Sequence, residues 1–281
     1  MFNLIVLVKQ VPDVTDVSEE VMKPDGTLNR EALPSIINPE DLNALEEALK
    51  IKDRFPAHVT VVSMGPPKAS EVLKDCLMRG ADEAILLTDK FFAGSDTQAT
   101  SYILAQAIKK IGRFDIIFCG RQAIDGDTAQ VGPQVAEKLG INQLTYVFEI
   151  MEIHKGGIVV KRETEEGFEV VKSKLPALLT IMSKANEPRP KDVKKAIAYK
   201  NIPILSPEEY KGKDNKKVFI KKWDHTSFDV DLERCGLKGS PTKVKKVESA
   251  VLKKIDTKLI SCTEEEIAYM FKELIEDHII A

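Results

Sequence analysis

The stretch from Cys119 to Pro133 combines residue types that suit an anionic nucleotide. It reads Cys-Gly-Arg-Gln-Ala-Ile-Asp-Gly-Asp-Thr-Ala-Gln-Val-Gly-Pro, after a strand-like segment at 115–119 and before a helix-like segment at 134–139. Free backbone N–H groups in such a loop, and the positive end of the helix that follows, attract phosphate. The loop matches neither GxxxxGK followed by Ser or Thr nor GxGxxG. A nucleotide site and a simple capped turn therefore both fit these residues.

Three glycines shape our expectation for this loop. We predict that Gly120, Gly126 and Gly132 turn the backbone with positive φ and let a ligand approach closely. Pro133 is tolerated only in the first turn of a helix, so the helix should begin near Ala129. Four polar side chains can cap this helix or bond a ribose and a ring edge, namely Asp125, Asp127, Thr128 and Gln130.

Four units of strand followed by helix must position this loop. The continuous apolar run at 4–8 is typical of a strand that is covered on both faces in a parallel sheet. Segments 58–63, 84–88 and 115–119 also predict strands. Segments with helical spacing follow each run. We therefore expect a doubly wound, mostly parallel α/β sheet with its ligand crevice at the carboxyl ends of the strands.

Further candidate residues follow the first two strands. Lys9 ends the first strand, where it is equally well explained as a ligand contact or as a solvated lysine. Asn38 and Pro39 suit the N-cap and the first position of a helix, and capping alone accounts for both. Met64 and Gly65 start the turn into the next helix.

A cluster of hydroxyl groups follows the third strand. Asp96 or Thr97 is expected to cap a helix whose first turn also contains Thr100 and Ser101. These hydroxyls suit a diphosphate, and they equally suit bonds to their own backbone.

The pattern changes after residue 140. Segments 145–153, 157–164 and 168–173 predict an antiparallel meander added to the sheet, and 175–182 predicts one more buried strand. The lysine-rich stretch 191–200 follows. Its apolar residues suit a partner contact or a solvated connecting helix; they are Val193, Ile197 and Tyr199.

The sequence predicts two parts, a nucleotide- or flavin-binding α/β domain over 1–200 and a C-terminal arm over 201–281. A helix at 263–276 closes the arm, with Thr263 and Glu266 as a capping box. Its apolar stripe consists of Ile267, Met270, Phe271, Leu274 and Ile275. We expect this stripe to dock on another chain, with packing on its own domain as the alternative.

Composition excludes several classes of function. The 281 residues are 43% hydrophobic and 30% charged, with a net charge of −3, so nucleic acid and anionic membranes are not favoured partners. The basic run 243–254 lacks the interleaved aromatic residues of a nucleic-acid site. We expect no membrane span, no secretion signal and a cytoplasmic location. The four cysteines lack metal-ligand spacing, so no metal is expected. Residues 21–28 suggest a short hairpin.

Five motifs, in order, closely resemble the β subunit of electron-transfer flavoproteins. They are Val8-Lys-Gln-Val-Pro-Asp13, Asn38-Pro-Glu-Asp41, Ser63-Met-Gly-Pro66, Asp96-Thr-Gln-Ala-Thr-Ser101 and Gly120 to Gly132. The resemblance implies an adenine-nucleotide-binding, Rossmann-like fold and a heterodimer with an FAD-bearing α subunit. It implies no catalytic side chain. The cofactor-binding residues that it implies are Leu7, Lys9, Asn38, Pro39, Asp41, Met64, Gly65, Asp96, Thr97, Thr100, Arg121, Gln122, Ala123, Ile124, Asp125, Gly126, Asp127, Thr128, Ala129, Gln130, Val131 and Gly132.

The same motifs are most similar to the electron-bifurcating branch of that family. This implies FAD in the β subunit, NADH as hydride donor, and electron delivery both to a flavin-containing acyl-CoA or hydroxy-acid dehydrogenase and to ferredoxin or flavodoxin. The resemblance makes Val193 the apolar anchor for the dehydrogenase, although Pro190 to Lys195 departs from the aromatic-rich pattern that is commoner in the family. A non-bifurcating subunit with structural AMP is one alternative. A stand-alone adenine-nucleotide protein similar to universal stress proteins is another.

Overall fold

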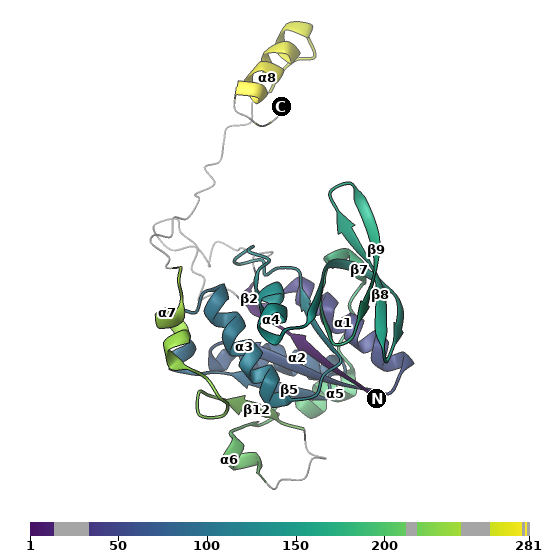
Figure 1. The fold of residues 1–281 in the computed structure, drawn as a ribbon. Helices are drawn as coiled ribbons and strands as arrows, with labels where there is room; N and C mark the ends of the chain where they lie inside the picture. Colours follow the sequence, from purple (N-terminus) through teal and green to yellow (C-terminus); the bar gives the residue numbers. More distant parts are fainter. Residues whose placement is uncertain (14–33, 212–217, 243–258, 277–278, 280–281) are drawn as a thin grey trace.

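A ten-stranded sheet with helices on both faces organises the chain (Figure 1). The computed structural model describes residues 1–13, 34–211, 218–242, 259–276 and 279. The strand order is β11-β12-β5-β4-β1-β6-β10-β7-β8-β9. All pairs from β11 to β7 are parallel, and the pairs β7·β8 and β8·β9 are antiparallel. The expected doubly wound, mostly parallel sheet is confirmed.

The central strands are covered on both faces because their consecutive apolar side chains point to opposite sides. These strands are β1 (Phe2–Leu7), β4 (Ala57–Met64), β5 (Glu83–Leu87), β6 (Ile116–Gly120) and β10 (Ala177–Ile181). Within β1, Leu4 and Val6 belong to one core cluster, and Ile5 and Leu7 belong to the other. Each such side chain stabilises the fold by about 1.5–3 kcal/mol on burial.

Two pairs of helices cover the two faces. Helices α1 (Pro39–Arg54) and α2 (Ser70–Arg79) pack on the Leu4 face, and α3 (Thr97–Ile111) and α4 (Val131–Leu139) pack on the Ile5 face. The chain thus crosses to the other face between α2 and α3. The short 3-10 turns are η2 (Pro67–Ala69), η3 (Lys90–Phe92), η4 (Ser183–Ala185) and η5 (Leu232–Arg234).

The predicted meander is confirmed as an antiparallel extension of the sheet. It consists of β7 (Asn142–His154), β8 (Gly157–Thr164) and β9 (Gly167–Lys174). A separate antiparallel pair, β2 (Gln10–Pro12) and β3 (Ser35–Ile37), follows β1. The hairpin expected at 21–28 lies outside the described residues.

Two short strands, which the sequence did not predict, lie within the C-terminal arm expected over 201–281. Strands β11 (Ile204–Leu205) and β12 (Ile220–Trp223) extend the parallel sheet beside β5. Trp223 and Phe228 are buried in the second core cluster. Strand β11 has only two residues, and β12 contains two lysines, so neither strand shows a recognisable apolar pattern in the sequence. The remaining helices are α5 (Val193–Tyr199), α6 (Pro207–Tyr210) and α7 (Gly236–Gly239).

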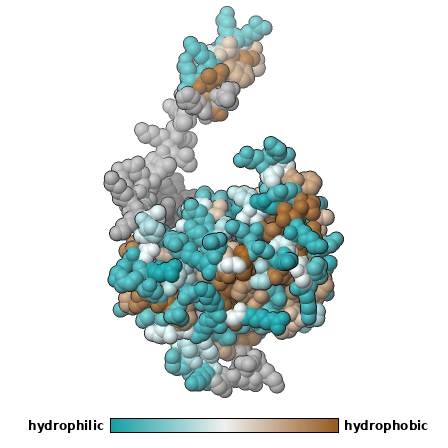
Figure 2. Space-filling view, viewed as in Figure 1, coloured by the Kyte–Doolittle hydropathy of each residue, from teal (hydrophilic) through white to brown (hydrophobic). Residues whose placement is uncertain are grey.

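Helix α8 (Glu264–Glu276) lies apart from the sheet and contains no buried residue (Figure 1). The Thr263 hydroxyl accepts a hydrogen bond from Glu266 N (3.4 Å), but the Glu266 carboxylate bonds Ser261 instead of completing the capping box. Apolar residues gather on α8 and over the β7–β9 extension (Figure 2). Docking of the α8 stripe stays a prediction, and the basic run 243–254 lies outside the described residues. No helix within the described part of the chain is long and apolar enough to cross a bilayer.

Candidate functional site

A cavity of about 920 Å³ opens at the carboxyl ends of β1, β4, β5 and β6. Eighteen of the sequence-predicted site residues line it: Leu7, Lys9, Asp41, Met64, Gly65, Asp96, Thr97, Thr100, Arg121, Gln122, Ala123, Gly126, Asp127, Thr128, Ala129, Gln130, Val131 and Gly132. Four do not: Asn38, Pro39, Ile124 and Asp125. The sequence motifs therefore locate the cavity, but some motif residues lie behind its wall.

Asn38 supports the loop from behind. It precedes α1 at the N-cap position, yet its side chain makes no capping bond. Its Nδ2 donates to the Gln122 carbonyl (2.8 Å), and its Oδ1 accepts from Ile124 N (3.1 Å). Capping alone, which the sequence allowed as a full explanation, therefore does not describe Asn38. The side chain instead fixes the path of the loop.

Replacing Asn38 with aspartate is expected to loosen the loop and destabilise the fold. Aspartate keeps an acceptor for Ile124 N but loses the donor to the Gln122 carbonyl, and it places a carboxylate against that carbonyl at a fully buried position. An unsatisfied buried group of this kind costs about 1–3 kcal/mol. Urea unfolding of the wild type and Asn38→Asp measures the loss. Equal midpoints would contradict the supporting role.

Glu40 also holds the loop, a role that its place in the Asn38-Pro-Glu-Asp41 motif did not reveal. Its carboxylate accepts from Gln122 N (3.0 Å) and from Arg121 Nε (3.3 Å). The first turn of α1 thus contacts the loop through both Asn38 and Glu40. A long-range pairing of this kind has no local sequence signal.

Lys9 pairs with the loop across the mouth of the cavity. Its Nζ donates to both oxygens of Asp125, at 2.7 and 2.8 Å. The two side chains are 49% and 30% exposed, so the ion pair itself contributes only about 0–1 kcal/mol. The main effect of the pair is to hold the loop close to the end of β1.

Asp41 joins the ends of two neighbouring strands at the base of the cavity. Its carboxylate accepts from Lys9 N and from Gly120 N, both at 2.8 Å. Burial raises the pKa of Asp41 to about 7, against the opposing effect of these two N–H donors. Because β1 and β6 are adjacent, Asp41 links their ends at the point where the helices change faces.

The raised pKa of Asp41 predicts a stability that depends on pH. Between pH 3.8 and about 7 the folded protein holds a proton on Asp41 that the unfolded chain has lost. The free energy of unfolding should therefore fall as pH rises through this window, by up to about 1.4 kcal/mol per pH unit. Urea unfolding at pH 5, 6 and 7 should show this slope in the wild type and less of it in Asp41→Asn. If the free energy of unfolding changed with pH equally in the wild type and in Asp41→Asn, the raised pKa of Asp41 would be contradicted.

The prediction of positive φ at the three loop glycines is wrong. Among the described residues, the loop positions with positive φ are Asp127 (47°) and Ala129 (51°). A left-handed residue at Ala129 also explains why α4 begins at Val131 rather than near Ala129. None of the loop side chains was found to cap α4, whose N-cap residue Gln130 makes no side-chain capping bond.

Two of these glycines are required by close packing instead. A Cβ on Gly120 would lie 2.7 Å from Asp41 Oδ1 and 2.8 Å from Asp41 N. A Cβ on Gly132 would lie 2.7 Å from Cys119 Sγ. A Cβ on Gly126 would meet no described atom within 4 Å. Gly126 is therefore the loop glycine that packing within this chain does not explain.

The first turn of α3 forms the opposite wall. Asp96 caps α3 by accepting from Ala99 N (3.0 Å), as predicted, and its second oxygen accepts from Thr242 N (3.0 Å). The Thr97 hydroxyl donates to Gln130 Oε1 (2.9 Å), which links α3 to the loop. The Ser101 hydroxyl lies within hydrogen-bond distance of the Gln98 carbonyl of its own helix (3.0 Å), one of the two roles that the sequence allowed, and of Gln134 Oε1 on α4 (2.9 Å).

The sequence motifs missed one end of the cavity. It is lined by Thr88, Asp89, Lys90, Phe92, Ala93, Gly94 and Ser95 after β5, and by Lys222 of β12. The position of residues 88–95 after a strand was a usable signal. Nothing in the sequence indicated Lys222, because β12 was not foreseen.

The cavity is suited to holding a ligand more than to reacting with one. Cys119 lines it, but burial raises the pKa of this thiol far above its usual range, so the thiol stays protonated. In the described part of the chain, no group of three His, Cys, Asp or Glu residues could hold a metal ion.

A doubly wound sheet with a strand-end cavity, closed by a loop and two helix N-termini, defines a class of α/β proteins that bind nucleotide-sized ligands. The electron transfer flavoprotein domain model matches residues 25–205. The chain is 48% identical to the electron transfer flavoprotein subunit beta of Clostridium acetobutylicum, over 99% of this chain and 100% of that protein. The chain belongs to the electron transfer flavoprotein family, among its β subunits.

Two further relatives are named as parts of larger complexes. The chain is 42% identical to the Caffeyl-CoA reductase-Etf complex subunit CarD of Acetobacterium woodii, over 99% of this chain and 100% of that protein. It is 40% identical to the acryloyl-CoA reductase electron transfer subunit gamma of Anaerotignum propionicum, with the same coverage.

Proposed function

We propose that this chain is the β subunit of a heterodimeric, electron-bifurcating flavoprotein and that its cavity holds FAD. The observation that supports FAD most is the reach of the cavity. Its lining extends from β6 across β1, β4 and β5 to Lys222 of β12. At about 4.8 Å per strand, these five strands span roughly 19 Å. A mononucleotide fills only part of such a crevice, whereas a dinucleotide lies across it.

The residues of the cavity fit a flavin dinucleotide. Its volume of about 920 Å³ lies in the upper range of ligand sites. The N-termini of α3 and α4 both meet the cavity. Asp96 caps α3, whereas α4 has no side-chain cap, so the N–H groups at the start of α4 favour a diphosphate. Thr97, Thr100 and Thr128 add hydroxyl groups to the lining. We assign cofactor contact to the eighteen lining residues, and support of the loop to Asn38 and to the Lys9–Asp125 pair. Pro39 and Ile124 do not line the cavity.

The chemistry would come from the bound flavin, which accepts a hydride from NADH and passes electrons on singly. The chain binds and orients this group and surrounds it with fixed dipoles. We propose that one electron path leads through the FAD of an α subunit to a flavin-containing acyl-CoA or hydroxy-acid dehydrogenase, and the other to ferredoxin or flavodoxin. The names of two relatives, which mention caffeyl-CoA and acryloyl-CoA reductases, support an acyl-CoA partner. We place this complex in the cytoplasm.

An anaerobic assay of the heterodimer tests this function. NADH is supplied together with an acyl-CoA dehydrogenase, its enoyl-CoA substrate and ferredoxin, and the reduction of ferredoxin is followed. The proposal predicts that ferredoxin is reduced by NADH only while the enoyl-CoA is also being reduced. Dehydrogenase-linked electron transfer with no NADH oxidation would instead favour a non-bifurcating subunit that holds structural AMP.

A further inference from the structure

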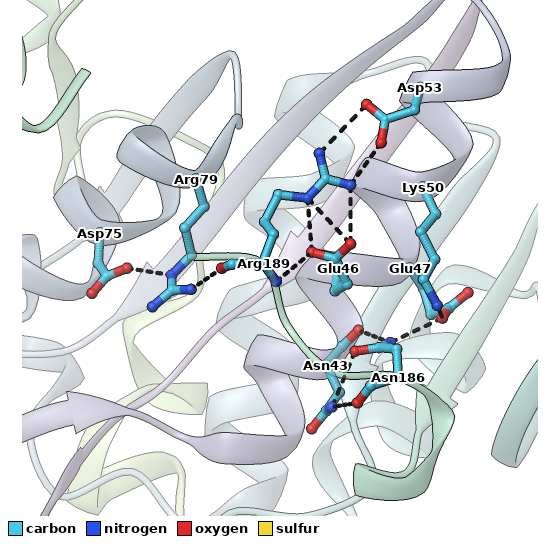
Figure 3. A network of polar contacts seen from close by, with 9 residues as sticks. All are labelled: Asn43, Glu46, Glu47, Lys50, Asp53, Asp75, Arg79, Asn186 and Arg189. Atoms are coloured by element: carbon cyan, nitrogen blue, oxygen red, sulfur yellow. Dashed lines mark hydrogen bonds and ion pairs between the residues drawn. The ribbon is translucent and has the colours of Figure 1, made fainter. Parts of the chain in front are cut away.

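The segment that leads into α5 is fastened to α1 by a pair of asparagines (Figure 3). Asn43 Nδ2 donates to the backbone carbonyl of Asn186 (2.8 Å) and to its Oδ1 (3.1 Å). In return, Asn186 Nδ2 donates to the Asn43 carbonyl and to Glu47 Oε1, both at 2.9 Å. Each asparagine thus donates its side-chain amide to the other residue, which fixes the chain at residue 186 against the side of α1.

Arg189 makes the strongest contact of this segment. Its Nε and Nη2 donate to the two oxygens of Glu46, at 2.8 and 3.0 Å, and Nη2 also reaches Asp53 Oδ2 at 2.7 Å. The Arg189 backbone N–H donates to the same Glu46 carboxylate (3.0 Å). The Glu46 side chain is only 8% exposed, so Arg189 replaces most of the water that would otherwise solvate its carboxylate. Because the guanidinium is planar and makes two bonds to one carboxylate, it fixes both the orientation of Arg189 and its distance from α1.

Helix α2 fastens the next residues. Arg79 donates to the Arg189 carbonyl and pairs with Asp75 (2.6 Å), and Lys191 Nζ pairs with the second oxygen of Asp75 (2.6 Å). Asp192 N donates to the carbonyl of Met78 (3.0 Å), and α5 begins at the following residue. The start of α5 is therefore held by contacts from two helices of the sheet domain.

Helix α5 itself presents an apolar pair to solvent. Val193 and Ile197 are 72% and 76% exposed and lie four residues apart, which places them on one face. Lys194 and Lys200 are also exposed beside them. Tyr199, which the sequence grouped with this pair, packs against the core instead. A partner surface that fits α5 is an apolar socket with an acidic rim.

Helix α1 connects this surface to the nucleotide cavity. Its N-terminal residues support the loop 120–124 through Asn38, Glu40 and Asp41. Its following turns hold the 186–189 segment through Asn43, Glu46 and Glu47, and the last turn contributes Asp53. One sixteen-residue helix thus contacts both functional segments.

We propose that α1 supports both the cavity loop and the segment before α5, a role that we call the brace. Within it, Arg189 and Glu46 are positioning residues. They hold α5 at a fixed place relative to the cavity, so that a partner on α5 meets the bound cofactor in one geometry. This inference rests on the proposed function for its dehydrogenase partner, and it takes α5 as the docking surface because the sequence resemblance makes Val193 the apolar anchor. Its structural part, that the Arg189 contacts order α5, stands separately.

The experiment compares Arg189→Gln and Glu46→Gln with the wild type, each purified as the heterodimer with its α subunit. Amide hydrogen exchange over residues 186–199, read by mass spectrometry, should be at least about tenfold faster in both variants. Flavin per heterodimer and NADH-dependent reduction of a small dye should not change. The KM for an acyl-CoA dehydrogenase that the wild type reduces should rise about tenfold, with kcat retained. Arg189→Lys should restore the exchange rate and the KM only in part, because lysine keeps the charge but lacks the planar guanidinium that bonds both Glu46 oxygens.

Arg162→Gln is the matched control. Arg162 is 30% exposed, as is Arg189, and it pairs with Glu169 (2.5 Å) on the β7–β9 extension. It should leave exchange over 186–199 and the dehydrogenase KM unchanged. If Arg189→Gln does not accumulate, Asp53→Asn is the alternative, because it removes only the more exposed of the two carboxylates that Arg189 contacts. It should raise the exchange rate and the KM in the same way, but by less.

Unchanged exchange over 186–199 in Arg189→Gln and Glu46→Gln would overturn the brace. Faster exchange with an unchanged KM would overturn its role in docking. The exchange measurement does not depend on which nucleotide is bound. If the wild-type heterodimer contains AMP instead of a second FAD, the proposed function fails while the brace is still tested.

Discussion

The heterodimer with Gly126→Val is expected to lose the flavin of the β subunit while its chain remains as stable as the wild type. Gly126 lines the cavity, and a Cβ there would meet no described atom within 4 Å. Gly126 is not one of the described glycines with positive φ, so a valine at this position introduces no backbone strain of that kind. We therefore expect the valine side chain to interfere mainly with a ligand in the cavity rather than with the described part of the chain. We expect flavin affinity to fall by at least about a hundredfold, because a ligand that needs close backbone approach is excluded.

Flavin content after gel filtration and the unfolding midpoint of the apoprotein measure the two parts of this prediction. Gly156→Val is the control, since Gly156 lies in the β7–β8 turn and a Cβ there would only reach His154 at 3.5 Å. It should keep full flavin. Full flavin occupancy in Gly126→Val would count against contact between this loop and the cofactor. A lowered midpoint would mean that Gly126 has a packing role.

Gly120→Ala is expected to show the opposite result, a large loss of stability. Its added Cβ would lie 2.7–2.8 Å from Asp41 Oδ1, Asp41 N and the Glu40 carbonyl carbon. Two of these are backbone atoms at the start of α1, so they cannot move aside as a flexible side chain does. The same shift would disturb the Gly120 N–H bond to Asp41. Overpacking of this kind costs about 1–3 kcal/mol or more.

Urea unfolding of the apoprotein measures this loss, with Gly126→Ala as the matched substitution in the same loop. Gly126→Ala should unfold with the wild-type midpoint, since its Cβ has open space. A midpoint for Gly120→Ala equal to that of Gly126→Ala would contradict the close packing of α1 on β6.

The sequence predicts the central architecture well because the signal there is periodic and local. Short segments rich in apolar residues identify the strands β1, β4, β5 and β6, since both faces of each strand are buried. The N-cap position of Asn38 and the capping bond of Asp96 follow from short-range preferences. The position of the cavity then follows from the rule that ligands bind at the carboxyl ends of such strands.

The same reasoning fails where long-range packing decides the outcome. Glycine permits a positive φ but does not require it, and here Asp127 and Ala129 adopt it while Gly120 and Gly132 serve close contact. The role of Asn38 depends on a loop more than eighty residues away. Strand β12 is short and contains two lysines, so only its neighbour β5 reveals it as part of the sheet.

The nucleotide content of the purified heterodimer tests the central claim most directly. The protein is denatured, and the released nucleotides are separated and quantified against the amount of both subunits. An FAD-binding cavity in this chain predicts two FAD per heterodimer and no AMP. One FAD with one AMP would contradict that claim.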